Sequence, residues 1–378
     1  MSVTDNSSST NYPVTMEELL KLTLEKSGSD LHLVAGSSPS IRINGQLILQ
    51  DYPTMTPQDV KDLLFSILTP QQQESYEEDW ELDFSYSIEG LARYRGNAMY
   101  QRGSMAAVFR IVPYNIPEID VLGLPPGVKD LCKLSRGLIL VTGPTGSGKS
   151  TTLAAIIDYI NKTRRVNIVT VEDPIEFLHS HNVAIVRQRE VRTDTHTFSS
   201  ALRHVLRHDP DVILIGEMRD LESIAIALTA AETGHLVLST LHTQTAPLTI
   251  SRIVDVFEAD RRDQVRQQLA NSLRAVIAQQ LMPLSDGKGR VAAVEFMLDT
   301  MAVRSMIREG KEHQLYSSIQ TGQTAGMQTM DQALQKLYAA GKITRQIALD
   351  YSVDKNELER LIQGRSDPSS ASSLKWRE

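Results

Sequence analysis

Two patterns of apolar side chains divide the sequence into an amino-terminal and a carboxy-terminal part. In residues 82–88, LDFSYSI, every second side chain is apolar, as in a strand with one buried face. Residues 92–112 predict two more strands around a glycine-containing turn. Thr15 begins a helix-capping pattern, and Thr56 is a cap followed by a first-turn proline. Residues 16–112 are therefore predicted to form a small α+β domain.

Unbroken apolar runs replace this alternation in residues 128–364. Such runs are typical of parallel strands buried on both faces, and mostly helical segments separate them: GLILVTG, NIVTVED, VAIVRQ, DVILIGE and HLVLSTLH. This order predicts a parallel α/β sheet, with helices after residue 300. The proline-rich segment 113–127 is predicted to be a linker, and the polar ends, 1–15 and 365–378, to be disordered or flexible tails.

The composition predicts a cytoplasmic protein. Residues 1–14 lack the apolar core of a signal peptide, and no window holds the roughly 18 apolar residues of a spanning helix. Cys132 is the single cysteine, which excludes an intrachain disulfide framework and a multi-cysteine zinc site. The net charge is −7 and the arginines are scattered among acids, which argues against nucleic acid as the main partner.

The stretch GPTGSGKS fits the phosphate-binding pattern G-x-x-x-x-G-K-[ST] and lies between an apolar strand and a helical run, as that motif requires. Its backbone N–H groups would surround the phosphates of ATP, Lys149 would reach the β- and γ-phosphates, and Ser150 would bind Mg²⁺. The alternative is a glycine-rich turn without a ligand. The predicted nucleotide-binding residues are Gly143, Pro144, Thr145, Gly146, Ser147, Gly148, Lys149, Ser150 and Thr151.

Two acidic segments follow neighbouring strands, and ligands of doubly wound sheets lie beyond the carboxyl ends of the strands. Glu217, after DVILI, is predicted to hold Mg²⁺ through water, or alternatively to pair with Arg219 at a solvated strand end. In VTVEDPIEF, Glu172 is the predicted general base, with Pro174 fixing the turn that aims it. Glu176 is the other candidate base, and a turn with capping acids is the alternative.

Two histidines, His235 and His242, flank the apolar strand LVLSTL. A histidine at a strand end could contact the γ-phosphate and report it to a neighbouring subunit. The alternative for each is an ordinary core histidine.

The sequence resembles the PilT-type retraction ATPases of type IV pili, within the wider family of secretion ATPases. The resemblance covers nearly the whole chain after residue 15 and rests on separated motifs in the family's order: SGSDLHL, the P-loop, TVEDPIEF, LIGEMRD, AAETGHLVLSTLHT, AVRSMIREG and GMQTMDQAL. It implies a PAS-like amino-terminal domain, a RecA-like core and a homohexameric ring with ATP sites between its domains. It also implies that Glu172 is the base, that Glu217 lies near the metal, and that His235 and His242 lie beside the γ-phosphate.

The resemblance further implies that arginines of the amino-terminal domain contact the phosphates, and the matching residues are Arg95 and Arg110. The alternation of Arg95 with Tyr94, and of Arg110 with Phe109 and Ile111, places both arginines on the polar side of their strands. A solvated sheet face is the alternative interpretation.

Together these features predict a hexameric Mg-ATP-hydrolysing motor that retracts type IV pili in twitching motility. The resemblance implies that it works at the cytoplasmic face of the inner membrane, on the pilus platform protein, with a paralogous retraction ATPase as a further candidate partner. An assembly or type II secretion ATPase is the first alternative, although that branch usually carries a tetracysteine zinc site. A nucleic-acid motor and a nucleotide-gated scaffold without catalysis are the others.

Overall fold

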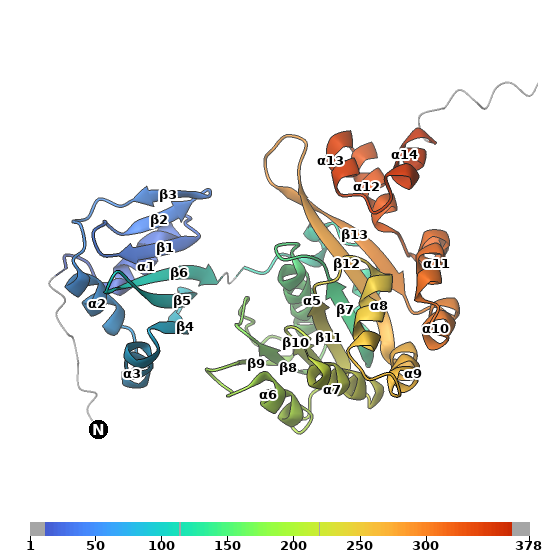
Figure 1. Cartoon of the computed structure of the whole chain (residues 1–378), viewed down its shortest axis with the longest axis horizontal. Coiled ribbons are helices and arrows are strands. Elements are labelled where there is room, and N and C mark those ends of the chain that lie inside the picture. Colours follow the sequence, from blue (N-terminus) through green and yellow to red (C-terminus); the bar gives the residue numbers. More distant parts are fainter. Residues whose placement is uncertain (1–11, 113–114, 219, 365–378) are drawn as a thin grey trace, which may run out of the picture. The chain divides into compact units, whose positions relative to one another are not determined.

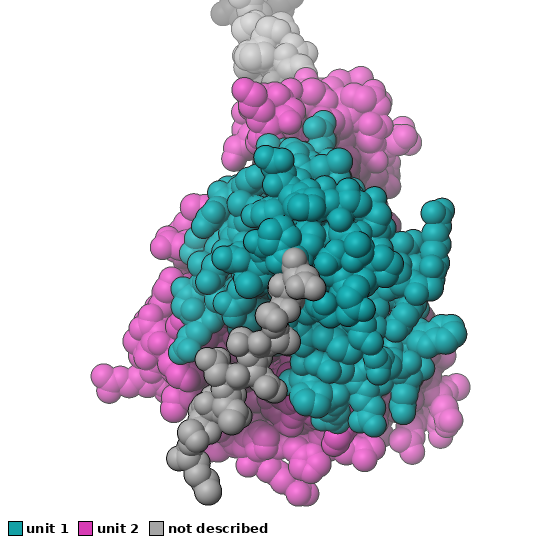
Figure 2. Space-filling view, turned by 90° about the vertical axis from the view of Figure 1, so that its left-hand side faces the viewer, with its two compact units in different colours: residues 1–115 teal, residues 116–378 magenta. Residues whose placement is uncertain are grey.

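The computed structural model describes residues 12–112, 115–218 and 220–364, which belong to two compact units, residues 1–115 and 116–378 (Figures 1 and 2). The predicted tails 1–15 and 365–378 lie mainly outside the described residues. The described end of the first one is ordered, contrary to expectation, because Tyr12 and Val14 are buried in the core of the first unit.

The first unit contains a sheet of six strands with three helices. The helices are α1 (Met16–Glu25), α2 (Pro57–Phe65) and α3 (Pro70–Asp79), and the strands are β1 (Asp30–Val34), β2 (Ser40–Ile43), β3 (Gln46–Leu49), β4 (Glu81–Ile88), β5 (Ala92–Gln101) and β6 (Ser104–Val112). The strand order is β3-β2-β1-β6-β5-β4, with antiparallel neighbours. Thr15 and Thr56 cap α1 and α2 with reciprocal hydrogen bonds, as their spacing predicts.

The second unit begins with η1 (Ile119–Leu122) and α4 (Gly127–Leu131). Its other elements are β7 (Gly137–Thr142), α5 (Lys149–Thr163), β8 (Asn167–Glu172), β9 (Ile185–Glu190), α6 (Phe198–Val205), β10 (Val212–Ile215), α7 (Leu221–Glu232), β11 (Leu236–Leu241), α8 (Ala246–Asp255), α9 (Arg262–Ser272), β12 (Leu273–Pro283), β13 (Arg290–Leu298), α10 (Met301–Arg308), η2 (Glu312–Gln314), α11 (Leu315–Thr321), η3 (Gly322–Ala325), α12 (Met330–Ala339), α13 (Arg345–Asp350) and α14 (Lys355–Gln363). Ile119 is buried in this unit's core, so the proline-rich segment is only in part a connection between units.

The sheet of the second unit has the order β13-β12-β7-β11-β10-β8-β9 (Figure 1). All neighbours are parallel except β12 and β13, which are antiparallel, so the sheet is mixed rather than purely parallel. These two strands are not among those predicted from the sequence. Their apolar runs are interrupted by Gln279 and Glu295, which are themselves buried.

Both faces of this sheet are covered, and successive residues of each strand serve opposite faces. In β7, Ile139 and Val141 belong to the core on the α4 and α5 side, whereas Leu138 and Leu140 belong to the core shared with α6 to α11. Double-sided burial explains why the strands read as unbroken apolar runs. Among the described residues, no helix is long and apolar enough to cross a membrane.

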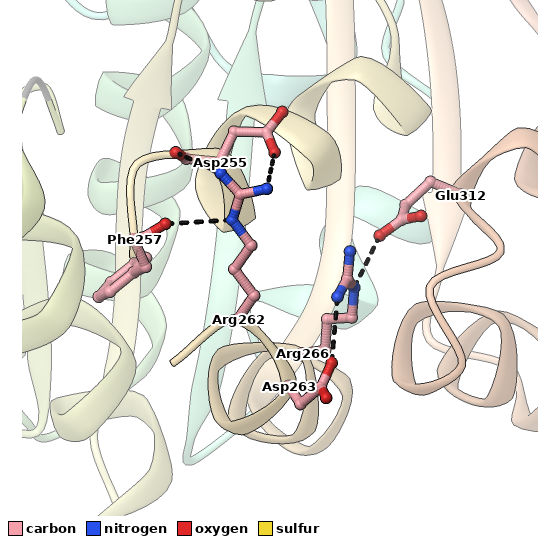
Figure 3. Close-up of polar contacts among 6 residues, drawn as sticks. All are labelled: Asp255, Phe257, Arg262, Asp263, Arg266 and Glu312. Carbon is pink, nitrogen blue, oxygen red and sulfur yellow. Dashed lines mark hydrogen bonds and ion pairs between the residues drawn. The ribbon is translucent and has the colours of Figure 1, made fainter. Parts of the chain in front are cut away.

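Two arginines of α9 connect this helix to its neighbours on both sides (Figure 3). Arg262 Nε donates to the Phe257 carbonyl at 3.1 Å, and Arg262 Nη1 lies 3.5 Å from Asp255 Oδ1 at the end of α8. One turn later, Arg266 Nε lies 3.2 Å from Glu312 Oε1 in η2. Polar contacts of α9 therefore connect it both to the end of α8 and to η2, which follows α10.

Candidate nucleotide-binding and hydrolysis site

The P-loop joins the carboxyl end of β7 to α5, as its sequence context predicts. Gly143, Gly146 and Gly148 have φ angles of 141°, 79° and 88°, a region that side chains with a Cβ rarely adopt. A Cβ on Gly143 would lie 2.2 Å from the Gln279 carbonyl oxygen, and one on Gly148 would lie 2.8 Å from Gln279 Nε2. The loop therefore depends on glycine for both its conformation and its close packing on β12.

Two polar groups of the P-loop are arranged as a phosphate ligand requires. Ser147 Oγ is buried and has no hydrogen-bond partner among the described residues, and Lys149 is buried at the start of α5 with Ser150 next to it. Lys149 Nζ donates to the Gly143 and Pro144 carbonyls at 2.9 and 3.0 Å. Burial lowers the Lys149 pKa, and nearby carboxylates oppose this effect. These groups fit a bound triphosphate.

His242 connects Lys149 with Glu217. Its Nε2 lies 3.1 Å from Glu217 Oε1, and its Nδ1 lies 3.5 Å from Lys149 Nζ. Because a lysine ammonium can only donate, Nδ1 is the acceptor in this arrangement and the Nε2 hydrogen faces Glu217. The ends of β10 and β11 thus bring an acid and a histidine to the P-loop lysine, as the order of parallel strands predicts. Arg219, the alternative partner of Glu217, lies outside the described residues.

Glu172 ends β8 and is buried, with 9% of its surface exposed. Its Oε1 accepts hydrogen bonds from Thr170 Oγ1 at 2.6 Å and from Gln188 Nε2 at 3.1 Å. Burial raises the Glu172 pKa and these two hydrogen bonds partly oppose it. Glu176, the other candidate base, is exposed. A buried, oriented carboxylate with a raised pKa is the better arrangement for proton abstraction.

The structure does not bring His235 to this site. His235 precedes β11 and His242 follows it, so the two lie at opposite ends of a six-residue strand, roughly 20 Å apart at ~3.3 Å per residue. His235 Nδ1 lies 3.0 Å from the Ala230 carbonyl oxygen at the end of α7. Of the two histidines, His242 lies beside the P-loop lysine of its own chain and His235 lies at the other end of β11.

Arg95 and Arg110 form a directly opposed pair on β5 and β6 in the first unit. Arg110 Nε donates to Asp30 Oδ1 at 2.7 Å, and Arg42 Nε lies 3.8 Å from Asp30 Oδ2. Burial raises the Asp30 pKa, but the hydrogen bonds from the Ser29 hydroxyl and from Arg110 outweigh it and leave the pKa lowered. Asp30 is therefore paired with Arg110 and Arg42, while Arg95 and Arg110 are both exposed on their strands.

Three further residues support the site. Gln279 of β12 packs under the P-loop and accepts a hydrogen bond from Thr152 Oγ1 at 2.8 Å. Thr170, the first residue of the motif TVEDPIEF, and Gln188 donate to Glu172. No motif marks Gln279 or Gln188, because their contacts depend on which strands become neighbours. No group of three or more His, Cys, Asp or Glu side chains in the described segments could hold a metal by itself.

Comparisons with known proteins show the family of the chain. The profile of the family described as "Type II/IV secretion system protein" matches residues 102–363. The chain is 50% identical over 331 residues to the Pseudomonas aeruginosa type IV pilus retraction ATPase PilT, covering 88% of this chain and 96% of that one. It is 42% identical over 360 residues to the Pseudomonas aeruginosa type IV pilus ATPase PilU, covering 95% and 94%.

A solved structure is similar as well. The crystal structure of the pilus retraction motor PilT with bound ADP superposes with a TM-score of 0.87 at 49% identity, covering 92% of this chain and 99% of that one. The chain therefore belongs to the Type II/IV secretion system protein family, in its PilT-type branch.

Proposed function

We propose that this protein is an ATP-hydrolysing motor that retracts type IV pili. The observation that carries the proposal is the convergence of Lys149, His242 and Glu217 at one edge of the sheet, with the buried Glu172 on the neighbouring strand. The retraction ATPase at 50% identity and the ADP-bound motor structure support the nucleotide and the task.

The side chains of this chain have distinct parts in the proposed reaction. The P-loop amides and Lys149 bind and orient the phosphates, because phosphoryl transfer depends mainly on positioning and on neutralising charge. Glu172 orients the attacking water and accepts its proton. Ser150 and Glu217 would hold Mg²⁺, which neutralises charge on the β- and γ-phosphates when it is bound. His242 lies between Lys149 and Glu217 and would contact the γ-phosphate.

The motor is proposed to be a homohexamer in which Arg95 and Arg110 complete a nucleotide site formed with the second unit. Membership of a secretion ATPase family supports the ring. The opposed positions of Arg95 and Arg110, of which Arg110 is paired with Asp30, support the role of the first unit, because guanidinium groups suit a phosphate. The proposed partners are the pilus platform protein, at the cytoplasmic face of the inner membrane, and a paralogous retraction ATPase.

Labelled pili in living cells test this proposal. A strain lacking the protein should build surface pili but fail to shorten them, and the wild-type gene should restore shortening. A Lys149→Ala gene should not restore it, because that variant lacks the phosphate-binding cation. Cells without pili in the deletion strain would make the protein an assembly motor instead.

A further inference from the structure

Gln188 connects the carboxylate of Glu172 to the loop that follows it. Its Nε2 donates to Glu172 Oε1 at 3.1 Å and to the Phe177 carbonyl at 2.8 Å. Its Oε1 accepts the His179 N–H at 2.8 Å. A single amide group thus fixes both the acid at the end of β8 and the loop of residues 173–179.

Strand register explains why this amide can reach Glu172. Gln188 lies directly opposite Thr170 in the parallel pair of β8 and β9, and Thr170 precedes Glu172 by two residues. All three side chains therefore lie on one face of the sheet. Thr170 and Gln188 donate to the same oxygen, Oε1, from neighbouring strands. Two donors on one oxygen restrict the rotation of the carboxylate far more than one donor does.

We propose that Gln188 is a positioning residue for ATP hydrolysis, which fixes the Glu172 carboxylate together with Thr170 and couples its orientation to the loop 173–179. The inference rests on the proposed function of Glu172 as general base. Gln188 acts through Glu172, and its amide also contacts the loop at Phe177 and His179, beside the Glu176 backbone N–H that donates to Glu172 as well.

The electrostatic surroundings of Glu172 make the Gln188 hydrogen bond measurable. The charged groups on the neighbouring elements are Glu176 in the loop, Glu190 opposite Glu172 on β9, and Glu217 beyond the end of the adjoining strand β10. Lys149 is the cation on which the charges of Glu176 and Glu217 act. Burial raises the Glu172 pKa, the negative charge of Glu176 adds to this, and hydrogen-bond donors oppose it. Loss of one donor should therefore shift the titration of Glu172 to higher pH.

The test is kcat measured against pH at saturating Mg-ATP for the full-length wild type, Gln188→Met and Gln188→Glu. In Gln188→Met the acidic limb should move up by about one pH unit, so that kcat on that limb falls by up to about tenfold, since a hydrogen bond to a charged group is lost. KM should change little. Gln188→Glu keeps an oxygen for the His179 N–H but adds a like charge, so its limb should move further than that of Gln188→Met.

Arg187→Gln, at an exposed position on the same strand, is the matched control and should keep the wild-type profile. Wild-type acidic limbs in both Gln188 variants would overturn the inference. So would a kcat that falls equally at every pH, because a general loss of structure would have that effect. Glu172→Gln tests the role of Glu172 separately from that of Gln188. Normal hydrolysis by this variant would refute Glu172 as the general base, whatever the Gln188 variants do.

Discussion

Glu295 should make the stability of the second unit fall as the pH rises from acidic to neutral. This glutamate lies on β13 with no exposed surface. It accepts the Ala246 N–H at 2.6 Å and the Met330 N–H, so it receives backbone N–H groups from the first residues of both α8 and α12. Burial raises its pKa to about 7, although these two backbone hydrogen bonds oppose the change.

The expected size follows from the pKa difference between the folded and unfolded states. The ordinary value is 4.5 and the folded value is about 7, and each unit is worth about 1.4 kcal/mol. Because the folded pKa is raised, this contribution is fully present below pH 4.5 and is lost as the pH rises through 7. Between pH 5 and pH 8, the free energy of unfolding should lose about 2 to 3 kcal/mol through Glu295.

Glu295→Gln removes the titration and keeps a carbonyl oxygen that can accept the Ala246 and Met330 N–H groups. The amide NH₂ group of the glutamine would occupy the buried position of Oε2, which has no hydrogen-bond partner in the described chain. The variant should therefore lose a constant amount of unfolding free energy at every pH. The informative quantity is therefore the difference between wild type and variant as a function of pH, rather than its value at one pH.

The assay is urea unfolding followed by circular dichroism from pH 5 to pH 8, with m-values compared to check that both proteins unfold in the same way. From pH 5 to pH 8, the free energy of unfolding of the variant should rise by about 2 to 3 kcal/mol relative to that of the wild type. Glu258→Gln, which changes an exposed carboxylate, should follow the wild-type curve. Parallel curves for wild type and Glu295→Gln would refute the reasoning.

Two further predictions concern arginines in the two units. Arg95→Ala together with Arg110→Ala should lower ATPase activity at least tenfold without unfolding the first unit, measured by steady-state turnover and circular dichroism; full activity would exclude these arginines from the site. Arg266→Met should destabilise the second unit by about 1 to 2 kcal/mol, because its pair with Glu312 is 22% and 15% exposed. Arg262→Met, whose pair with Asp255 is 38% and 60% exposed, should cost no more than about 1 kcal/mol. Equal losses in urea unfolding would show that burial of the pair does not decide its contribution.

The sequence was sufficient for those parts of the site that local chemistry determines. The P-loop pattern requires glycines at positions 143 and 148, and both have positive φ angles. Acids that follow buried parallel strands must lie at the carboxyl edge of the sheet, which is where Glu172 and Glu217 are found.

Other parts of the site depend on contacts between segments that are distant in the sequence, so no local sequence pattern identifies them. Gln279 and Thr152 are 127 residues apart in the sequence, and Gln279 lies on β12, where polar residues interrupt the apolar run. Gln188 supports Glu172 because β9 pairs with β8 in one register. His235 and His242 belong to one motif, but the strand between them places them at its two ends, which the motif alone does not indicate.

Single-turnover hydrolysis by Glu172→Gln tests the central claim most directly, because it separates nucleotide binding from chemistry. The amide keeps an oxygen that can accept the Thr170 and Gln188 hydrogen bonds but cannot accept a proton from water. We expect ATP affinity to change little and the rate of the chemical step to fall by about 10² to 10⁴. A wild-type rate in this variant would contradict the assignment of Glu172 as the base of an ATP-driven motor.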